Sequence, residues 1–249
     1  RLGDPIRLAI MSATLDVDNE MDYWGHEAVH YNTNGGTHPV EMLHRPSLSP
    51  AQAVWELITE YQRTGIMVFV SGRYEAEQVR VELESIAAKN KTEHGPIEIV
   101  SVTGSSSATE RDNASALPTG KVKVLIGTTV IESGNSLLWV NGGVSSGVAK
   151  NLEIYGNAHR VQESPLPQQR IIQQKGRVGR FGPGVFSLVH PLSLEVRPMT
   201  IPPAIQRLLL TEVVMTAASH QIGVEDLTFS ALETPPAHAL DTAVDRLKK

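Results

Sequence analysis

The sequence predicts an α/β protein with a parallel sheet flanked by helices, followed by a small, mostly helical region. The apolar run at 66–70 is uninterrupted, which is typical of a parallel strand buried on both faces. Strand-like and helix-like segments also alternate along most of the chain, and this alternation predicts right-handed crossovers within one parallel sheet. A proline-rich linker then leads to helix-like segments at 204–219 and 236–247.

Helix and strand signals follow one another in a regular order. A short apolar run at 7–11 predicts a first strand. Ser49 is placed to cap a helix that begins at Pro50, because Gln52 completes the spacing of a capping box, and we expect Gly65 to end this helix. The remaining elements are expected as strands at 66–70, 97–102 and 122–126, a helix over 75–89 and a polar segment at 104–116.

Composition excludes several classes of protein. Hydrophobic residues make up 41% of the chain, too many for a disordered protein, and no apolar run approaches the roughly 18 residues of a membrane span. The absence of cysteine excludes a disulfide scaffold, a thiolate zinc site and a cysteine nucleophile. Arg1 begins a charged, proline-containing stretch, so we expect no secretory leader and an intracellular, cytoplasmic location.

The acidic net charge of −5 conceals a basic segment. Residues 150–180 contain six Lys or Arg and two Glu, a net charge of +4, so the rest of the chain sums to −9. The overall charge argues against a uniformly basic coat for nucleic acid, whereas the basic segment predicts a local phosphate-binding patch.

The segment Gln173–Arg180, with the sequence QQKGRVGR, is the sharpest motif. On a helix, Gln173, Gly176, Arg177 and Arg180 share one face because they lie three or four residues apart. Two glycines leave that face open for close approach, and two fixed guanidiniums can hold phosphate oxygens through paired hydrogen bonds. The alternative is a basic, solvated helix end. The pattern favours a phosphate-binding helix.

Several segments resemble motifs of superfamily 2 helicases, in the same order. Met11–Asp16 (MSATLD) is similar to motif III, Leu125–Gly134 to motif V and Gln173–Arg180 to motif VI. Other segments narrow the resemblance to the DEAH-box branch. They are 36–41, which resembles the start of the second domain, 68–72 (motif IV), 144–150 (the strand and β-hairpin before motif VI), and 205–210, 223–227 and 235–236 (the winged-helix region).

This resemblance implies a domain arrangement and an activity. Residues 1–40 would end a first RecA-like domain, 41–198 would form the second RecA-like domain, and 199–249 an incomplete winged-helix-like region. The chain would be the motor portion of an NTP-dependent RNA helicase that acts on single-stranded or partly duplex RNA. ATP or another NTP, with Mg²⁺, would be held mainly by the N-terminal RecA-like domain. The sequence has no GxxxxGKS/T phosphate loop and no DExH motif, so we expect a fragment that does not hydrolyse NTP alone.

The resemblance also assigns a role to each matching residue. Arg177 and Arg180 would stabilise charge on the transferring phosphoryl group, and Gln173 would position the nucleotide or the attacking water. The other roles fall into three groups: nucleotide binding by Gly134, Gly176 and Ser115; nucleic-acid binding by Ser71, Gly72, Arg73, Thr103, Thr128, Lys150 and Arg160; and coupling by Ser12, Thr14 and Glu132.

The segment 151–164 predicts a β-hairpin that would separate strands. Leu152 and Ile154 alternate with polar residues, and Gly156–Asn157 suits a tight turn. The alternative is an ordinary surface hairpin.

The chain departs from the family pattern at several positions, which suggests a divergent member. Motif V carries Gly134, closer to flavivirus-type and potyvirus-type helicases than to cellular DEAH proteins. Ser115 aligns with the aromatic residue that stacks on the nucleotide base, so we expect poor base selectivity. The other departures are Thr129, Pro167 and Gly36, where the family usually has Asn or Asp, Ser and Arg.

Two alternatives to a helicase remain open. A nucleic-acid-binding scaffold could keep the fold without turnover, and an unrelated nucleotide-binding enzyme could cradle phosphate in the loop 142–147, GGVSSG. We interpret His26, His30, His38 and His44 as surface or turn residues rather than metal ligands, and Trp24, Trp55 and Trp139 as core residues rather than base-stacking platforms.

Overall fold

The chain divides into two compact units. A computed structural model describes residues 8–12, 16–25, 28–32, 38–90, 95–118, 122–132, 137–155, 158–229 and 233–248. One unit spans 35–202, and the other combines 1–34 with 203–249. The limits of the first unit lie close to the expected boundaries at 40/41 and 198/199. The assignment of the flanking segments to a first RecA-like domain and a winged-helix-like region stays a prediction.

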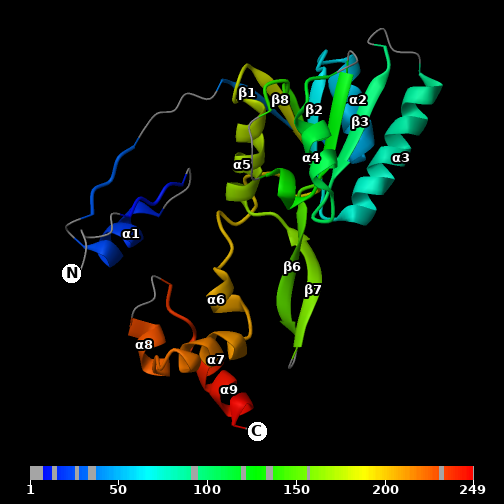
Figure 1. Cartoon of the computed structure of the whole chain (residues 1–249). Helices are drawn as coiled ribbons and strands as arrows, with labels where there is room; N and C mark the ends of the chain where they lie inside the picture. The colour runs from blue at the N-terminus through cyan, green and yellow to red at the C-terminus, as the bar shows by residue number, and fades with distance from the viewer. Residues whose placement is uncertain are drawn as a thin grey trace. The chain divides into compact units, whose positions relative to one another are not determined.

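A six-stranded parallel sheet forms the centre of unit 35–202 (Figure 1). Every neighbouring pair in the sheet is parallel, in the order β1-β8-β5-β2-β4-β3, so the predicted fold class is confirmed. The strands are β1 (Val40–His44), β2 (Gly65–Phe69), β3 (Ile97–Val102), β4 (Val122–Gly127), β5 (Gly142–Ser145) and β8 (Gly184–Leu188).

Helices cover both faces of this sheet. Helices α2 (Pro50–Thr59) and α3 (Arg73–Lys89) pack on the face that presents Ile66 and Val68. Helices α4 (Ala108–Ser115) and α5 (Gln168–Val178) pack on the opposite face, which presents Met67 and Phe69. Successive residues of β2 therefore point into two separate cores, as expected for a strand buried on both sides.

Helix α2 begins as predicted but ends differently. The Ser49 hydroxyl accepts a 3.1 Å hydrogen bond from the Gln52 amide, and the Gln52 side chain accepts one from the Ser49 amide at 2.9 Å. The helix ends at Thr59, and Gln62 turns the chain with a φ of 56°. Gly65 does not end the helix. It starts β2, where an added Cβ would lie 1.8 Å from the Trp139 carbonyl oxygen.

The predicted hairpin is confirmed. Strands β6 (Val148–Tyr155) and β7 (Ala158–Pro165) pair antiparallel and project from the sheet (Figure 1). Arg197, only 3% exposed, fixes the base of this hairpin. Its guanidinium donates to the Gly147 carbonyl at 2.8 Å and the Leu166 carbonyl at 2.7 Å, so both ends of the hairpin are tied to one buried cation.

The strand predicted at 7–11 is wrong for its described residues. Leu8–Met11 have no regular structure, and Met11 is 92% exposed. A strand needs a neighbour for its backbone hydrogen bonds, and no described strand pairs with this segment.

The segments of the other unit are helical where they have regular structure. They are α1 (Val17–Trp24), α6 (Ala204–Arg207), α7 (Thr211–Ser219), α8 (Val224–Phe229) and α9 (Ala237–Leu247). The single helix predicted over 204–219 is interrupted, because Leu208 is extended and Leu210 turns into a small core with Val214 and Leu240. The helix predicted at 236–247 is confirmed as α9. Within the described ranges, no helix is long and apolar enough to cross a membrane.

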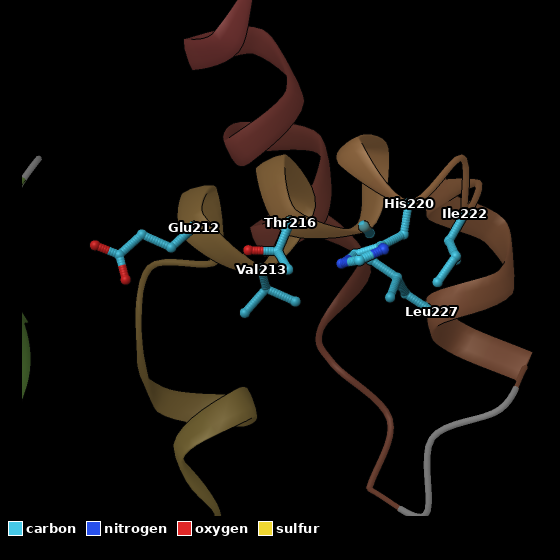
Figure 2. A pocket seen from close by; sticks show the side chains of 7 residues that line it. Glu212, Val213, Thr216, His220, Ile222 and Leu227 are labelled. Atoms are coloured by element: carbon cyan, nitrogen blue, oxygen red, sulfur yellow. The ribbon is translucent and has the colours of Figure 1, made fainter.

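An open hollow of 460 Å³ lies in the C-terminal segment of this unit (Figure 2). Side chains of α7, α8 and the turn between them line it, including Val213, His220 and Leu227. None of the residues predicted to bind nucleotide or nucleic acid lines this hollow.

Candidate nucleotide and nucleic-acid site

Three of the predicted nucleic-acid contacts lie at the carboxyl edge of adjacent strands. Gly127, the last residue of β4, pairs with Phe69 of β2 and with Val102 of β3. Thr103 and Thr128 directly follow β3 and β4, and Ser71 lies two residues after the end of β2. The register therefore brings Ser71, Thr103 and Thr128 to one edge, where ligands bind in parallel α/β sheets.

The hairpin meets this edge at the loop after β2. An added Cβ at Gly72 would lie 2.8 Å from the Lys150 amine, so this amine lies directly over the loop. The Ser71 hydroxyl lies 2.8 Å from a carboxylate oxygen of Glu163 and equally far from one of Glu75, and its single proton can serve only one of them at a time. Sequence reasoning missed both glutamates, since neither belongs to a recognisable motif.

Arg73 and Arg160 are both exposed, but they differ in their relation to Ser71, Gly72 and Lys150. Arg73 is the first residue of α3. Arg160 pairs with Glu153 across the hairpin, whereas Lys150 pairs with Glu163. Because Lys150 and Glu153 are three positions apart on one strand, Lys150 and Arg160 lie on opposite faces of the hairpin. The structure therefore does not bring Arg160 to the cluster formed by Ser71, Gly72, Lys150 and Glu163, which we call the Lys150 cluster.

Glu132 is the point at which motif V meets α5. The short 3₁₀ helix η1 (Thr129–Ile131) connects Thr128 to Glu132. The Arg170 guanidinium forms an ion pair with the Glu132 carboxylate, and the Gln174 amide donates to its other oxygen at 2.7 Å. Arg177 donates to the main-chain carbonyl of Glu132. One acidic residue thus contacts three polar side chains of one helix.

Arg170 and Gln174 were missed by sequence reasoning. The signal that could have found them is their spacing, because positions 170, 174 and 177 lie on one helical face. Gln174 is only 1% exposed, and a buried amide needs a partner, which Glu132 supplies.

Helix α5 buries one side against the sheet and leaves part of motif VI accessible. Ile171 and Val178 are buried against the sheet, whereas Gln173 is exposed and Arg177 is half-buried. Burial lowers the pKa of the Arg177 guanidinium, and the nearby charge of Arg180 lowers it further, while Glu132 opposes this shift.

Two details of motif VI differ from the expectation. Helix α5 ends at Val178, so Arg180 lies in the following turn and is exposed there. An added Cβ at Gly176 would meet no atom within 4 Å, so this part of the face is open as expected. Gly179, however, does not leave the face open, because its carbonyl accepts a 2.7 Å hydrogen bond from the His38 amide and its Cα faces the His38 main chain.

Ser115 lies at the rim of a hollow of 380 Å³ on the α4 and α5 side of the sheet. Met67 and Leu125 form its apolar wall, and Arg111 contributes a polar group from α4. The Ser115 hydroxyl donates to the Arg111 carbonyl at 3.1 Å. Gly134 and Thr14 lie outside the described residues, and Ser12 belongs to the other compact unit.

The phosphate-cradle alternative is not supported by the geometry. Residues 142–145 form β5, and all of 142–147 are buried, so they present no open loop. Among the residues that the structure describes, no three His, Asp or Glu side chains converge as metal ligands.

The expectation for the tryptophans holds only in part. Trp55 and Trp139 pack against the two sheet cores. The core prediction is wrong for Trp24, which is 45% exposed because α1 has no buried face.

Comparison with known proteins identifies the family. The helicase conserved C-terminal domain matches residues 49–182, which is more than half of the chain. The chain belongs to this family. The helicase C-terminal domain so defined contains β2, β4, η1 and α5, and with them the described site residues from Ser71 to Arg180.

Relatives of this helicase domain confirm its resemblance to the C-terminal part of DEAH-box proteins. The chain is 24% identical over 100% of its length to an ATP-dependent RNA helicase HrpA of Borreliella burgdorferi, and 26% identical over 96% to a probable ATP-dependent RNA helicase DHX34 of Homo sapiens. It spans 31% and 22% of these two relatives.

Solved structures show the same fold. Two crystal structures of the Escherichia coli protein HrpB, described as a DExH-box NTPase and a DEAH/RHA helicase, superpose with TM-scores of 0.78 and 0.81. Sequence identity is 21% and 22%, over 99% and 95% of this chain and 31% and 30% of the HrpB chains. The RecA-like fold of the sheet is confirmed by this likeness.

Proposed function

We propose that this chain is the C-terminal motor portion of an NTP-dependent RNA helicase. The observation that carries the proposal is the position of Arg177. Its side chain contacts Glu132, and Glu132 ends the turn that begins at Thr128, so a phosphate-binding helix and a nucleic-acid edge meet at one residue. The names of the relatives, which are ATP-dependent RNA helicases, support the same conclusion.

The nucleotide side would be formed by motif VI. Arg177 and Arg180 stabilise negative charge on the transferring phosphoryl group, and Gln173 orients the nucleotide or the attacking water. Gly176 leaves open space for phosphate beside the arginines. The hollow at Ser115 takes the base through apolar contact and offers no aromatic ring for stacking, so NTPs are poorly distinguished.

The remaining catalytic groups would come from a RecA-like domain with a phosphate loop. That domain would hold the NTP and Mg²⁺ through its phosphate loop and acidic residues.

The nucleic-acid side would follow the carboxyl edge of the sheet. Ser71, Thr103 and Thr128 offer hydroxyl groups to backbone phosphates, and Lys150 adds a positive charge above Gly72. The hairpin β6–β7 acts as the strand separator. A nucleic-acid-binding scaffold, the alternative to a helicase, would make the same contacts with RNA but would not hydrolyse NTP.

The test is Arg180→Ala in a two-domain protein that joins this chain to a RecA-like domain with a phosphate loop. Turnover of NTP should fall by about a thousandfold, which is the effect of losing an arginine finger. Arg180 is exposed, so the melting temperature should change little. Lys89→Ala, an exposed basic residue on α3, is the matched control. Turnover within about threefold of the wild type would reject the assignment, and a wild type that binds RNA without turnover would establish the scaffold.

A further inference from the structure

Side chains of α5 contact both the carboxylate and the main-chain carbonyl of Glu132. Arg170 contacts one carboxylate oxygen and Gln174 the other, while the main-chain carbonyl accepts from Arg177. The Glu132 side chain is 12% exposed, so its carboxylate is largely shielded from water. The carboxylate therefore has one fixed orientation, and the carbonyl that holds Arg177 is fixed with it.

The turn from Thr128 to Glu132 is itself a hydrogen-bonded unit. The Ile131 amide donates to the Thr128 carbonyl at 3.0 Å, and the Glu132 amide donates to the Thr129 carbonyl at 3.1 Å. Ile131 is buried in the core on the α5 side of the sheet. A displacement at Thr128 must therefore move Glu132, because the turn is too short and too well bonded to absorb it.

We propose that Arg170 and Gln174 are positioning residues that clamp Glu132 to α5 and so couple nucleic-acid binding at Thr128 to the position of Arg177. This inference rests on the proposed helicase function. Neither Arg170 nor Gln174 needs to touch RNA or nucleotide. Their effect is to make the turn and the arginine-bearing helix move together, so that RNA at the sheet edge changes where Arg177 can reach.

The chain offers a closely matched control ion pair. Arg45 and Glu56 lie 2.8 Å apart, with side chains 34% and 14% exposed, against 35% and 12% for Arg170 and Glu132. Glu56 lies on α2, which covers the opposite face of the sheet from α5. The Arg45–Glu56 pair therefore matches the Arg170–Glu132 pair in exposure, and it involves no residue of motif V or motif VI.

The experiment compares Arg170→Met with Arg45→Met in the two-domain protein, with single-stranded RNA as the probe. For Arg170→Met, hydrolysis without RNA and the RNA affinity should stay within about twofold of the wild type, whereas stimulation by RNA should fall about tenfold. Arg45→Met should lower the melting temperature to a similar extent and keep the stimulation. Arg170→Lys keeps the positive charge and should therefore retain most of the stimulation of hydrolysis by RNA. Equal stimulation in both methionine variants would overturn the clamp.

A second measurement does not depend on the helicase function. The ¹⁵N signals of the Arg177 guanidinium in this chain alone should show faster hydrogen exchange in Arg170→Met, because the Glu132 carbonyl is no longer fixed. Arg45→Met should leave the exchange unchanged, and identical exchange in the two variants would overturn the clamp. A wild-type two-domain protein without RNA-stimulated hydrolysis would reject the proposed function, while the Arg177 signals would still decide whether the clamp exists.

Discussion

The Ser71 hydroxyl lies 2.8 Å from the Glu163 carboxylate, and this contact joins the loop after β2 to the hairpin. Lys150, the cross-strand partner of Glu163, lies over the same loop at Gly72. A negative charge is therefore placed among the groups proposed to hold backbone phosphates. The RNA binding proposed for this edge would be opposed by the negative charge of Glu163.

Opposite effects are expected when the two charges of this pair are removed. Glu163→Gln should raise the affinity for single-stranded RNA by about fivefold at low salt, which corresponds to about 1 kcal/mol for unit charges roughly 4 Å apart in water. Lys150→Gln should lower the affinity and reduce the slope of log affinity against log salt by about 0.7, the contribution of one phosphate contact. The measurement is fluorescence anisotropy with labelled single-stranded RNA across a salt series.

The same titration tests the phosphate track as a whole. Neutralising Arg73 or Arg160 should also flatten the salt dependence, although Arg160 lies on the opposite face of the hairpin from Lys150. An affinity for RNA that does not change between low and high salt would reject a phosphate-binding edge, because phosphate contacts release counterions.

The pH dependence of stability should depend on His190, which is half-buried after β8. Burial lowers the pKa of His190 below its ordinary value, and the charges of Arg197 and His44 act in the same direction, whereas Glu163 opposes them. The Leu192 amide donates to Nδ1 of His190 at 3.0 Å, and protonation of that nitrogen would break this hydrogen bond.

The unfolded chain therefore takes up this proton at a higher pH than the folded chain, and acid favours unfolding. The free energy of unfolding should be fully retained above about pH 6.5 and should fall as the pH drops through the lowered pKa of the folded state. His190→Asn keeps an acceptor for the Leu192 amide and removes the titration, so its denaturant-measured stability should fall less over the same range. Identical pH profiles for the two proteins would contradict this assignment.

The sequence predicts the centre of the sheet better than its edge. The continuous apolar run of β2 is predicted because that strand is buried on both faces, and β4 is predicted because it is apolar apart from Lys123. Strand β1 was missed because it has a neighbour on one side only, so it can carry exposed Glu41 and His44. Helix α4 was missed because it buries only Ala114, although Ser107 and Glu110 form a capping box that marks its start.

In the candidate site, residues marked by their local sequence could be predicted, whereas contacts between positions far apart in the sequence could not. Ser71, Thr103 and Thr128 could be predicted because each lies within two residues of the end of a predicted strand, and the ends of parallel strands lie together. The contacts of Glu132 could not, because Arg170 and Gln174 lie 38 and 42 positions away from it. Only the packing of α5 on the sheet brings them together.

The last prediction separates strand separation from NTP hydrolysis. Replacing residues 156–160 with a short Gly-Ser turn shortens the hairpin at its far end. Its base should stay in place, because Arg197 ties the Gly147 and Leu166 carbonyls together, and α5 packs on the sheet independently of the tip. In the two-domain protein, RNA-stimulated hydrolysis should then survive while duplex unwinding falls at least about tenfold.

A matched control distinguishes the tip from the hairpin as a whole. Leu152, Ile154 and Val161 are exposed on one face of β6–β7, and Val161 pairs with Leu152 across the strands. Val161→Thr keeps the strand and its β-branched shape, so unwinding and hydrolysis should both change little. If the tip replacement lowers unwinding and hydrolysis together, the hairpin is a structural element of the domain. If it lowers neither, the strands of the duplex are separated by another part of the protein.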